Sequence, residues 1–496
     1  MKRIVFILLA FSFVTFTKAQ TSGEYDLSEY ALPDLELQTL DFKFGLGGNG
    51  SGQQYNPDYE IGNNDYYHQS HGLSLQSDYS LYRNNRKQQL NLEAGFSLGG
   101  GVNKRSENDK LLFKERHFGP SLSLRLNSRF YLNDKLFYGA DPELRTNYNI
   151  HKEKSRNDDG DLLEDNINRS YVDILLPLKV GVGRIENVTD ARQAIFILEA
   201  LKDNGHLSRT ASKDEITAFA GLISETRNLR FFDNRIQKMK ELEALDSYLK
   251  ENGFAEGNHI SYFTTLMDYW NYGRPVPMGA GNRFSLVVAP GYRIYNSVSD
   301  EPGTLVDDKS RTTYKSLQAG MKFGHTKPYG LHWHHFFSFE AFAGWLKYDS
   351  GHPDDPGSPI REQSHPNLQI HHVHSLNYYM NTRTTVRLGY DISYTHFIDD
   401  SQPENDVLST SGDVVSGNIS LDAYYYISPK LRLSFDSRLR YFWQDLADEG
   451  MDMGDWTTDH KDVYTFYPVT DLQYAYKGYQ KRFNFNYNLS LRYSLF

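Results

Sequence analysis

Residues 483–496 read FNFNYNLSLRYSLF and carry the strongest structural signal in the chain. Every second side chain is aromatic or aliphatic, and the side chains between them are Asn, Ser or Arg. Successive side chains of a β-strand point to opposite faces of the sheet. The segment therefore predicts a last strand with one apolar face and one polar face, ending in the aromatic Phe496.

The same two-residue period recurs along most of the chain. It is clear at residues 90–98, 121–130, 172–182, 385–394 and 431–441, where one face is apolar and the other is polar or charged. Stretches of about 10 residues are long enough for a tilted strand to cross the hydrocarbon layer of a membrane. A soluble sandwich fits less well, because these Tyr-rich strands follow an export signal. The pattern predicts an all-β membrane protein, an antiparallel transmembrane β-barrel.

The composition agrees with this class. The 496 residues include 36 Tyr and 30 Phe, yet the mean hydropathy is only −0.61. Apart from the N-terminus, no run approaches the ~18 consecutive apolar residues of a transmembrane helix. A membrane barrel combines these features, because every second strand residue faces a polar lumen. The chain has no cysteine, which excludes disulfides, thiolate catalysis and cysteine-bound metals.

The N-terminus, MKRIVFILLAFSFVTFTKAQ, has the form of a secretory signal peptide. Two basic residues precede the apolar stretch 4–16, which is too short to span a bilayer as a helix, and Ala19 is a small residue before the expected cut. We expect removal of residues 1–19, with residues 20–37 as an N-terminal extension. The cut removes three Lys or Arg residues and changes the net charge from −10 to −13, which disfavours nucleic acid as a partner.

The number of strands follows from parity. The alternating segments number fifteen, whereas single-chain bacterial barrels have even counts with both ends in the periplasm. Pro468 signals a turn within the last long segment, because proline cannot donate to a strand ladder. A turn there gives about sixteen strands, within a range of about 14 to 16. The first barrel part then covers residues 38–184 and the second residues 281–496, with long polar loops near 100–116 and 150–169.

Residues 185–280 interrupt the strand pattern and predict a small α-helical insertion. Four segments carry apolar residues at the three- to four-residue spacing of a helix face. Thr189 is expected to cap the first helix, and Ser212 with Glu215 forms a capping box for the second. The strand count puts the insertion on the periplasmic side, either below the barrel or inside it as a plug. A stabilising bundle, a docking surface for a periplasmic protein, and a plug all stay open.

A glycine-rich stretch, Gly181-Val182-Gly183-Arg184, precedes the insertion. It lacks the third glycine of the dinucleotide fingerprint, and no parallel β-α-β unit follows. We interpret these glycines as allowing a tight change of direction where a strand ends.

Charged residues occupy the polar faces of the predicted strands. The candidate lumen-facing residues are Arg125, Arg129, Arg387, Arg432, Asp436, Arg438, Arg440 and Arg492. Opposite charges across a barrel either create a transverse field in a water-filled channel or pair and close the interior. The sequence leaves both alternatives open. The ladder of Arg432, Arg438 and Arg440 is the candidate contact for an anionic solute.

Two groups of histidines belong to neighbouring predicted strands. Imidazoles at alternating positions can bind a transition metal. The weak candidates for such a site are His332, His334, His372 and His374. The adjacent Trp333 and Phe337 favour an interfacial aromatic belt instead. We therefore expect no metal and no cofactor.

The signal peptide, the Tyr-rich alternating strands and the closing NLSLRYSLF together resemble the porin-like outer-membrane proteins of Gram-negative bacteria. The resemblance covers the strands, and the helical insertion departs from simple porins. It implies a location in the cell outer membrane, in contact with outer-membrane lipid and lipopolysaccharide. It also implies that the barrel-assembly machinery reads Phe496 as a terminal signal.

A channel or transporter with a periplasmic or plugging helical subdomain is the function that this resemblance favours. The alternative is a non-conducting scaffold whose insertion docks a periplasmic envelope or secretion partner. A second alternative is an outer-membrane hydrolase. No nucleophile elbow of the Gly-x-Ser-x-Gly kind is predicted, and we expect no enzymatic activity.

Overall fold

The structure is a computed structural model. It describes residues 25–31, 34–55, 64–107, 110–156, 162–228, 237–255, 259–272, 278–300, 308–351, 361–381, 383–398, 411–428, 431–447 and 478–493. The predicted signal peptide, the predicted turn at Pro468 and the terminal Phe496 lie outside the described residues, and these three predictions stay open.

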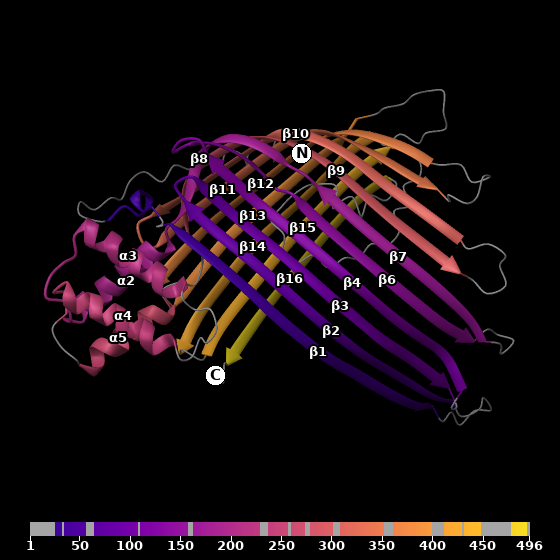
Figure 1. The fold of residues 1–496 in the computed structure, drawn as a ribbon, viewed down its shortest axis with the longest axis horizontal. Helices are drawn as coiled ribbons and strands as arrows, with labels where there is room; N and C mark the ends of the chain where they lie inside the picture. The colour runs from indigo at the N-terminus through magenta and orange to yellow at the C-terminus, as the bar shows by residue number, and fades with distance from the viewer. Residues whose placement is uncertain are drawn as a thin grey trace.

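One antiparallel sheet contains all the described strands (Figure 1). The strands are β1 (Leu35–Tyr55), β2 (Asn64–Asn85), β3 (Gln88–Glu107), β4 (Lys110–Tyr131), β5 (Leu136–Ala140), β6 (Glu143–Arg156), β7 (Leu162–Leu175), β8 (Leu178–Asn187), β9 (Gly279–Asp300), β10 (Asp308–Tyr329), β11 (Trp333–Gly351), β12 (Arg361–Asn381), β13 (Thr384–Phe397), β14 (Ser411–Ser428), β15 (Leu431–Ala447) and β16 (Gly478–Tyr493). Each strand pairs mainly with its neighbours in sequence. The strands β1 and β16 form the two edges, and among the described residues no pairing joins them.

Two of the crossings are interrupted. The strands β5 and β6 both pair with β4 and are separated at Asp141-Pro142. Likewise, β7 and β8 both pair with β9 and are separated at Leu176-Pro177. Proline breaks each ladder because it has no N–H to donate. The sixteen described strands thus form fourteen rows of one sheet, and the predicted antiparallel fold is confirmed.

The predicted long loops near residues 100–116 and 150–169 are wrong. The strand β3 runs to Glu107 and β4 starts at Lys110, while β6 and β7 remain paired to Arg156 and Leu162. Polar cross-strand contacts hold these extensions: Asn103 donates to Glu115 at 2.9 Å, and Arg105 lies over the Phe113 ring at 5.7 Å. Such pairs stabilise a sheet without an apolar face, which is why hydrophobic alternation alone missed them.

The two faces of the curved sheet differ sharply. Large apolar side chains are the exposed ones; Val180 is 56% exposed and Leu388 is 52% exposed. Their polar neighbours along the strands are more covered, as expected on the inside of a curved sheet, where side chains converge. The convex face is therefore apolar and the concave face is polar. This is the reverse of a soluble protein.

Four helices lie between β8 and β9 in the chain and gather at one end of the sheet (Figure 1). They are α2 (Thr189–Asp203), α3 (Lys213–Asn228), α4 (Gln237–Glu251) and α5 (Ile260–Tyr272). The last strand, β16, runs towards this same end (Figure 1), and Leu35 at the start of β1 packs against the helical core. None of the described helices has the length and apolar character needed to span a bilayer.

The helix boundaries test the predicted caps. The predicted Thr189 cap is wrong: the capping position is Val188, and the Thr189 hydroxyl instead accepts from the Met278 amide at 2.8 Å. The capping box is confirmed, since Glu215 N donates to Ser212 Oγ at 3.3 Å and Ser212 N donates to Glu215 Oε2 at 2.8 Å. Long-range pairing with Met278 thus outweighs local capping at the first helix.

Two glycines, one in β8 and one in β9, lie where these paired strands meet the helical insertion. Gly183 has a φ of +95° and Gly281 a φ of +129°, values that favour glycine. A Cβ on either residue would collide with a carbonyl oxygen of the opposite strand, from Asn282 or Arg184. This agrees with the interpretation of Gly183 as a residue needed for close approach where the strand ends.

Candidate functional site: the helical cap and the concave face

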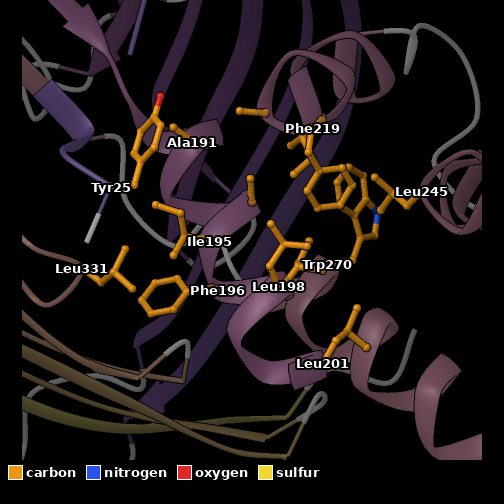
Figure 2. Close-up of a cluster of buried hydrophobic side chains, with 14 of the residues drawn as sticks. Tyr25, Ala191, Ile195, Phe196, Leu198, Leu201, Phe219, Leu245, Trp270 and Leu331 are labelled. Atoms are coloured by element: carbon orange, nitrogen blue, oxygen red, sulfur yellow. The ribbon is translucent and has the colours of Figure 1, made fainter. Parts of the chain in front are cut away.

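The helical cap, defined here as residues 189–272, closes onto the end of the sheet through an apolar core. Phe196 and Ile195 of α2 lie toward Leu331, which belongs to the turn between β10 and β11 (Figure 2). On the other side of α2, Leu198 and Leu201 belong to the same core as Phe219, Leu245 and Trp270. Helix α2 is therefore buried on both sides, between the sheet and the remaining helices.

Polar contacts attach the cap to the sheet. Arg383, in the turn between β12 and β13, donates to both carboxylate oxygens of Asp268 on α5, at 2.8 and 2.9 Å. Val188 N donates to Met278 O at 2.8 Å where the chain enters and leaves the cap. In this ion pair one nitrogen, Nη2 of Arg383, contacts both oxygens of Asp268 and joins segments far apart in sequence. We call it the latch.

The N-terminal segment 25–31 packs against the cap, which the sequence did not predict. Leu27 and Tyr30 are buried in the helical core, and Tyr25 shares a hydrogen bond of 2.9 Å with Thr217. Burial, and then the Asp190 carboxylate, raise the pKa of the Tyr30 hydroxyl. The signal in the sequence was the set of apolar residues within TSGEYDLSEYAL, which need a partner to bury them.

A buried polar network holds the four helices as one unit. Trp270 Nε1 donates to Glu241 Oε2 at 2.7 Å, joining α5 to α4. Arg227 donates to Gln193 at 2.6 Å and lies 4.3 Å from the centre of the Trp270 ring, joining α3 to α2 and α5. These contacts connect all four helices through buried polar side chains.

The strand registers put all the candidate lumen-facing residues on the concave face, in two groups. Arg125 and Arg129 lie on β4, and the other six lie on β13, β15 and β16. In the first group Arg125 donates to Glu143 at 3.2 Å and lies 3.8 Å from Glu93. Opposite charges do pair here, although a lumenal role for these residues stays a prediction.

The second group meets the cap. Register places Tyr379, Thr385 and Tyr424 side by side on β12, β13 and β14. The Arg432 guanidinium lies 5.8 Å from the Tyr424 ring and 5.9 Å from the Tyr426 ring. The remaining members of this face follow in register: Arg387 opposite Asp422, Asp422 opposite Asp436, and Arg432 opposite Arg492.

Arg192 of α2 completes this second group, and sequence reasoning missed it. Its guanidinium lies 4.1 Å from the centre of the Tyr379 ring. The available signal was a charge inside the apolar run ARQAIFIL. We define the floor cluster as Arg192, Tyr379, Thr385, Arg387, Tyr424 and Arg432.

The four histidine candidates for a metal site are held apart. Their partners are Tyr379 O for His332 at 2.7 Å, Thr326 Oγ1 for His334 at 2.7 Å, Ser338 O for His372 at 2.9 Å, and His335 Nε2 for His374 at 2.9 Å. Among the described residues, no three His, Asp or Glu side chains are grouped closely enough to hold a metal ion. His335 and His374 share the apolar outer face with Trp333 and Tyr378, as expected for an aromatic belt.

A Gly-x-Ser-x-Gly pentapeptide does occur, at residues 95–99. It lies in the middle of β3, and Ser97 shares a hydrogen bond of 2.6 Å with Ser121 on β4. A nucleophile elbow requires a turn from a strand into a helix. This pentapeptide is therefore a strand segment and not a hydrolase motif.

Comparisons with known proteins give distant matches only. No protein-family model matches the sequence, and no curated protein does. The translocator domain of the autotransporter NalP from Neisseria meningitidis matches 72% of this chain and 82% of that chain, with 10% identity and a TM-score of 0.22. The ferric yersiniabactin uptake receptor FyuA from Yersinia pestis matches 84% of this chain and 62% of that chain, with 8% identity and a TM-score of 0.31.

The CymD monoaromatic hydrocarbon channel matches 84% of this chain and 85% of that chain, with 11% identity and a TM-score of 0.22. These three structures are outer-membrane β-barrel proteins, the broad class that the sequence resembles. TM-scores below 0.5 add nothing further about the function of this chain.

Proposed function

We propose that this protein is an outer-membrane channel or transporter whose periplasmic end is covered by the helical cap. The observation that carries the proposal is the inverted polarity of the sheet, apolar outside and charged inside, with a cap attached at one end. A lumen lined by charged side chains suits polar solutes.

A membrane location is supported by the apolar outer face. Exposure of so many Leu, Phe, Val and Ile side chains to water would cost about 25 cal/mol for each Å². Contiguous apolar patches beyond a few hundred Å² mark contact with another apolar phase. Antiparallel strands with an export signal favour the outer membrane, and we expect insertion there by the barrel-assembly machinery.

The test is single-channel conductance in planar bilayers. We expect the full-length protein to open rarely and Asp268→Asn, which breaks the latch, to raise the open probability several-fold. The control is Asp246→Asn. Asp246 pairs with Lys250 at 2.9 Å, and both residues belong to α4, so this ion pair does not join the cap to the sheet. Absence of conductance in the full chain, in Asp268→Asn and in a variant lacking residues 185–275 would overturn the proposal.

A second candidate is a scaffold that docks a periplasmic partner, and exposed apolar side chains on the cap favour it. Ile260 is 84% exposed and Met239 is 70% exposed, and Phe263 and Met267 on α5 are also exposed. A photo-crosslinker at position 260, with one at the exposed Glu251 as the control, tests it in cells. No position-specific adduct with an envelope protein would count decisively against a scaffold.

A further inference from the structure

We propose that the floor cluster is a binding site for an anionic group, a carboxylate or phosphate carried by the solute, with Arg192 as its central ligand. The inference deepens the proposed function, and rests on it only in that the solute arrives through the lumen. The binding itself is independent of whether the protein conducts.

Arg192 is the first observation. Its side chain is charged, yet the residue is only 1% exposed. The guanidinium lies 4.1 Å from the Tyr379 ring centre and 5.6 Å from that of Phe196. Its Nε and Nη1 atoms are buried and have no hydrogen-bond partner. The Tyr379 hydroxyl is a neutral acceptor for this guanidinium, so no opposite charge compensates the buried charge, and such burial is costly.

Among the described residues, none of the groups that act on the Arg192 charge is a carboxylate. The groups that act on its charge are the Tyr379 and Tyr424 hydroxyls, and Arg192 in turn acts on His334. Asp190 precedes it by two residues but acts on Tyr30 and Tyr82, on the N-terminal side of the cap. The charge of Arg192 is therefore not neutralised by the side chains around it.

Two further arginines show the same feature. Arg387 Nε and Arg432 Nε are also buried without a hydrogen-bond partner. The carboxylates on this part of the concave face are Asp422 and Asp436, which face each other in register. Arg192, Arg387, Arg432 and Arg438 therefore outnumber the two acids by two charges. Such an excess attracts anions into a cleft with low-dielectric walls.

The donor chemistry selects the ligand class. A guanidinium presents its N–H groups in a planar fork that matches the paired oxygens of a carboxylate or phosphate. The hydroxyls of Tyr379, Thr385 and Tyr424 add neutral donors on the same row of the sheet. Arg192 also lies in the first turn of α2, where the partial positive charge of the helix favours an anion.

The experiment measures binding of inorganic phosphate and of succinate to the purified full-length protein in detergent, by isothermal titration calorimetry. We expect saturable binding of at least one probe, weakened about tenfold or more in Arg192→Met, as for loss of a charged hydrogen bond. The matched control is Arg209→Met, because Arg209 pairs with Glu215 on the exposed side of the cap. That variant should bind like the wild type.

A stability measurement separates a ligand site from a structural role. Without anion, Arg192→Met should unfold at the same temperature as the wild type or higher, since methionine removes an unpaired buried charge. Addition of phosphate or succinate should raise the unfolding temperature of the wild type only. If Arg192→Met does not fold, Arg432→Gln takes its place, and weaker binding by several-fold is expected.

Two results would overturn the site: no saturable binding of either probe to the wild type, or unchanged binding in the folded arginine variants. If the protein binds the probes but never conducts, the proposed channel function is refuted and the proposed anion site stands. A protein that conducts without binding refutes the site alone.

Discussion

At the scale of single residues, the first turn of α3 is held by the reciprocal hydrogen bonds of its capping box. Ser212 and Glu215 are three residues apart, so their mutual hydrogen bonds depend only on local helix geometry. Arg209 adds what the motif did not contain: its guanidinium donates to both Glu215 oxygens, at 3.0 and 2.7 Å. The box is thus reinforced by a bidentate ion pair.

This reinforcement makes the first turn of α3 sensitive to acid. The Arg209 guanidinium, and then the Ser212 amide and hydroxyl, lower the pKa of Glu215 from 4.5 to about 2. A carboxylate with a lowered pKa in the folded state stabilises that state above its unfolded pKa and loses this effect as the pH falls. We therefore expect the α3 N-terminus to weaken as the pH falls from 4.5 towards about 2.

Hydrogen–deuterium exchange of the first turn of α3, corrected for intrinsic rates, measures this effect. Protection should fall on acidification in the wild type, while Glu215→Gln should begin less protected and show a smaller change. Asp214→Asn, one residue earlier, is the matched control and should keep the wild-type profile. Equal acid responses in all three proteins would contradict the proposed role of Glu215.

Among the elements, strands could be predicted wherever their two faces differ in polarity. The alternation at residues 385–394 and 483–493 marks β13 and β16 because apolar and polar residues separate cleanly. The outer ends of β3 and β4 could not be found this way, since polar side chains occupy both faces there. The first helix cap also failed, because the Thr189 partner, Met278, lies 89 residues away.

Neighbouring positions on β2 test the polarity of the sheet directly. Leu75 is 41% exposed on the apolar face, beside Phe44 and Leu98 in register. We expect Leu75→Arg to destabilise the inserted protein by ~2–4 kcal/mol, the cost of an arginine facing lipid near the bilayer midplane.

Gln76→Arg is the control, because Gln76 faces the concave side and donates to Asp78 at 2.8 Å, a partner that arginine can keep. Urea unfolding in lipid vesicles, followed by the heat-dependent gel mobility of folded barrels, compares the two variants. A Leu75→Arg protein as stable as Gln76→Arg would show that this face does not contact lipid.

At the scale of the whole molecule, the packing partners of the cap could not be predicted from the sequence. The helical period predicted that apolar stripes need partners, but not that segment 25–31 and Leu331 would supply them. The floor cluster was equally out of reach: Arg192 and Arg432 are 240 residues apart in number, and only the folded cap brings Arg192 to the concave face. Local patterns predict elements, whereas contacts of this range depend on the complete fold.

The position of the cap gives a prediction about the orientation of the whole protein in the cell. If the cap lies in the periplasm, the opposite ends of the strands face the exterior. The chain has no cysteine, so single introduced thiols report on each end. Lys110 is exposed at the start of β4, and Glu251 is exposed at the end of α4.

We expect Lys110→Cys to react with a membrane-impermeant maleimide on intact cells, and Glu251→Cys to react only after the outer membrane is permeabilised. The reason is that a charged reagent cannot cross the bilayer to reach the periplasmic side. Equal labelling of both thiols in permeabilised cells controls for reactivity. Labelling of Glu251→Cys on intact cells would reverse the orientation, and with it the assignment of the floor cluster to the periplasmic end.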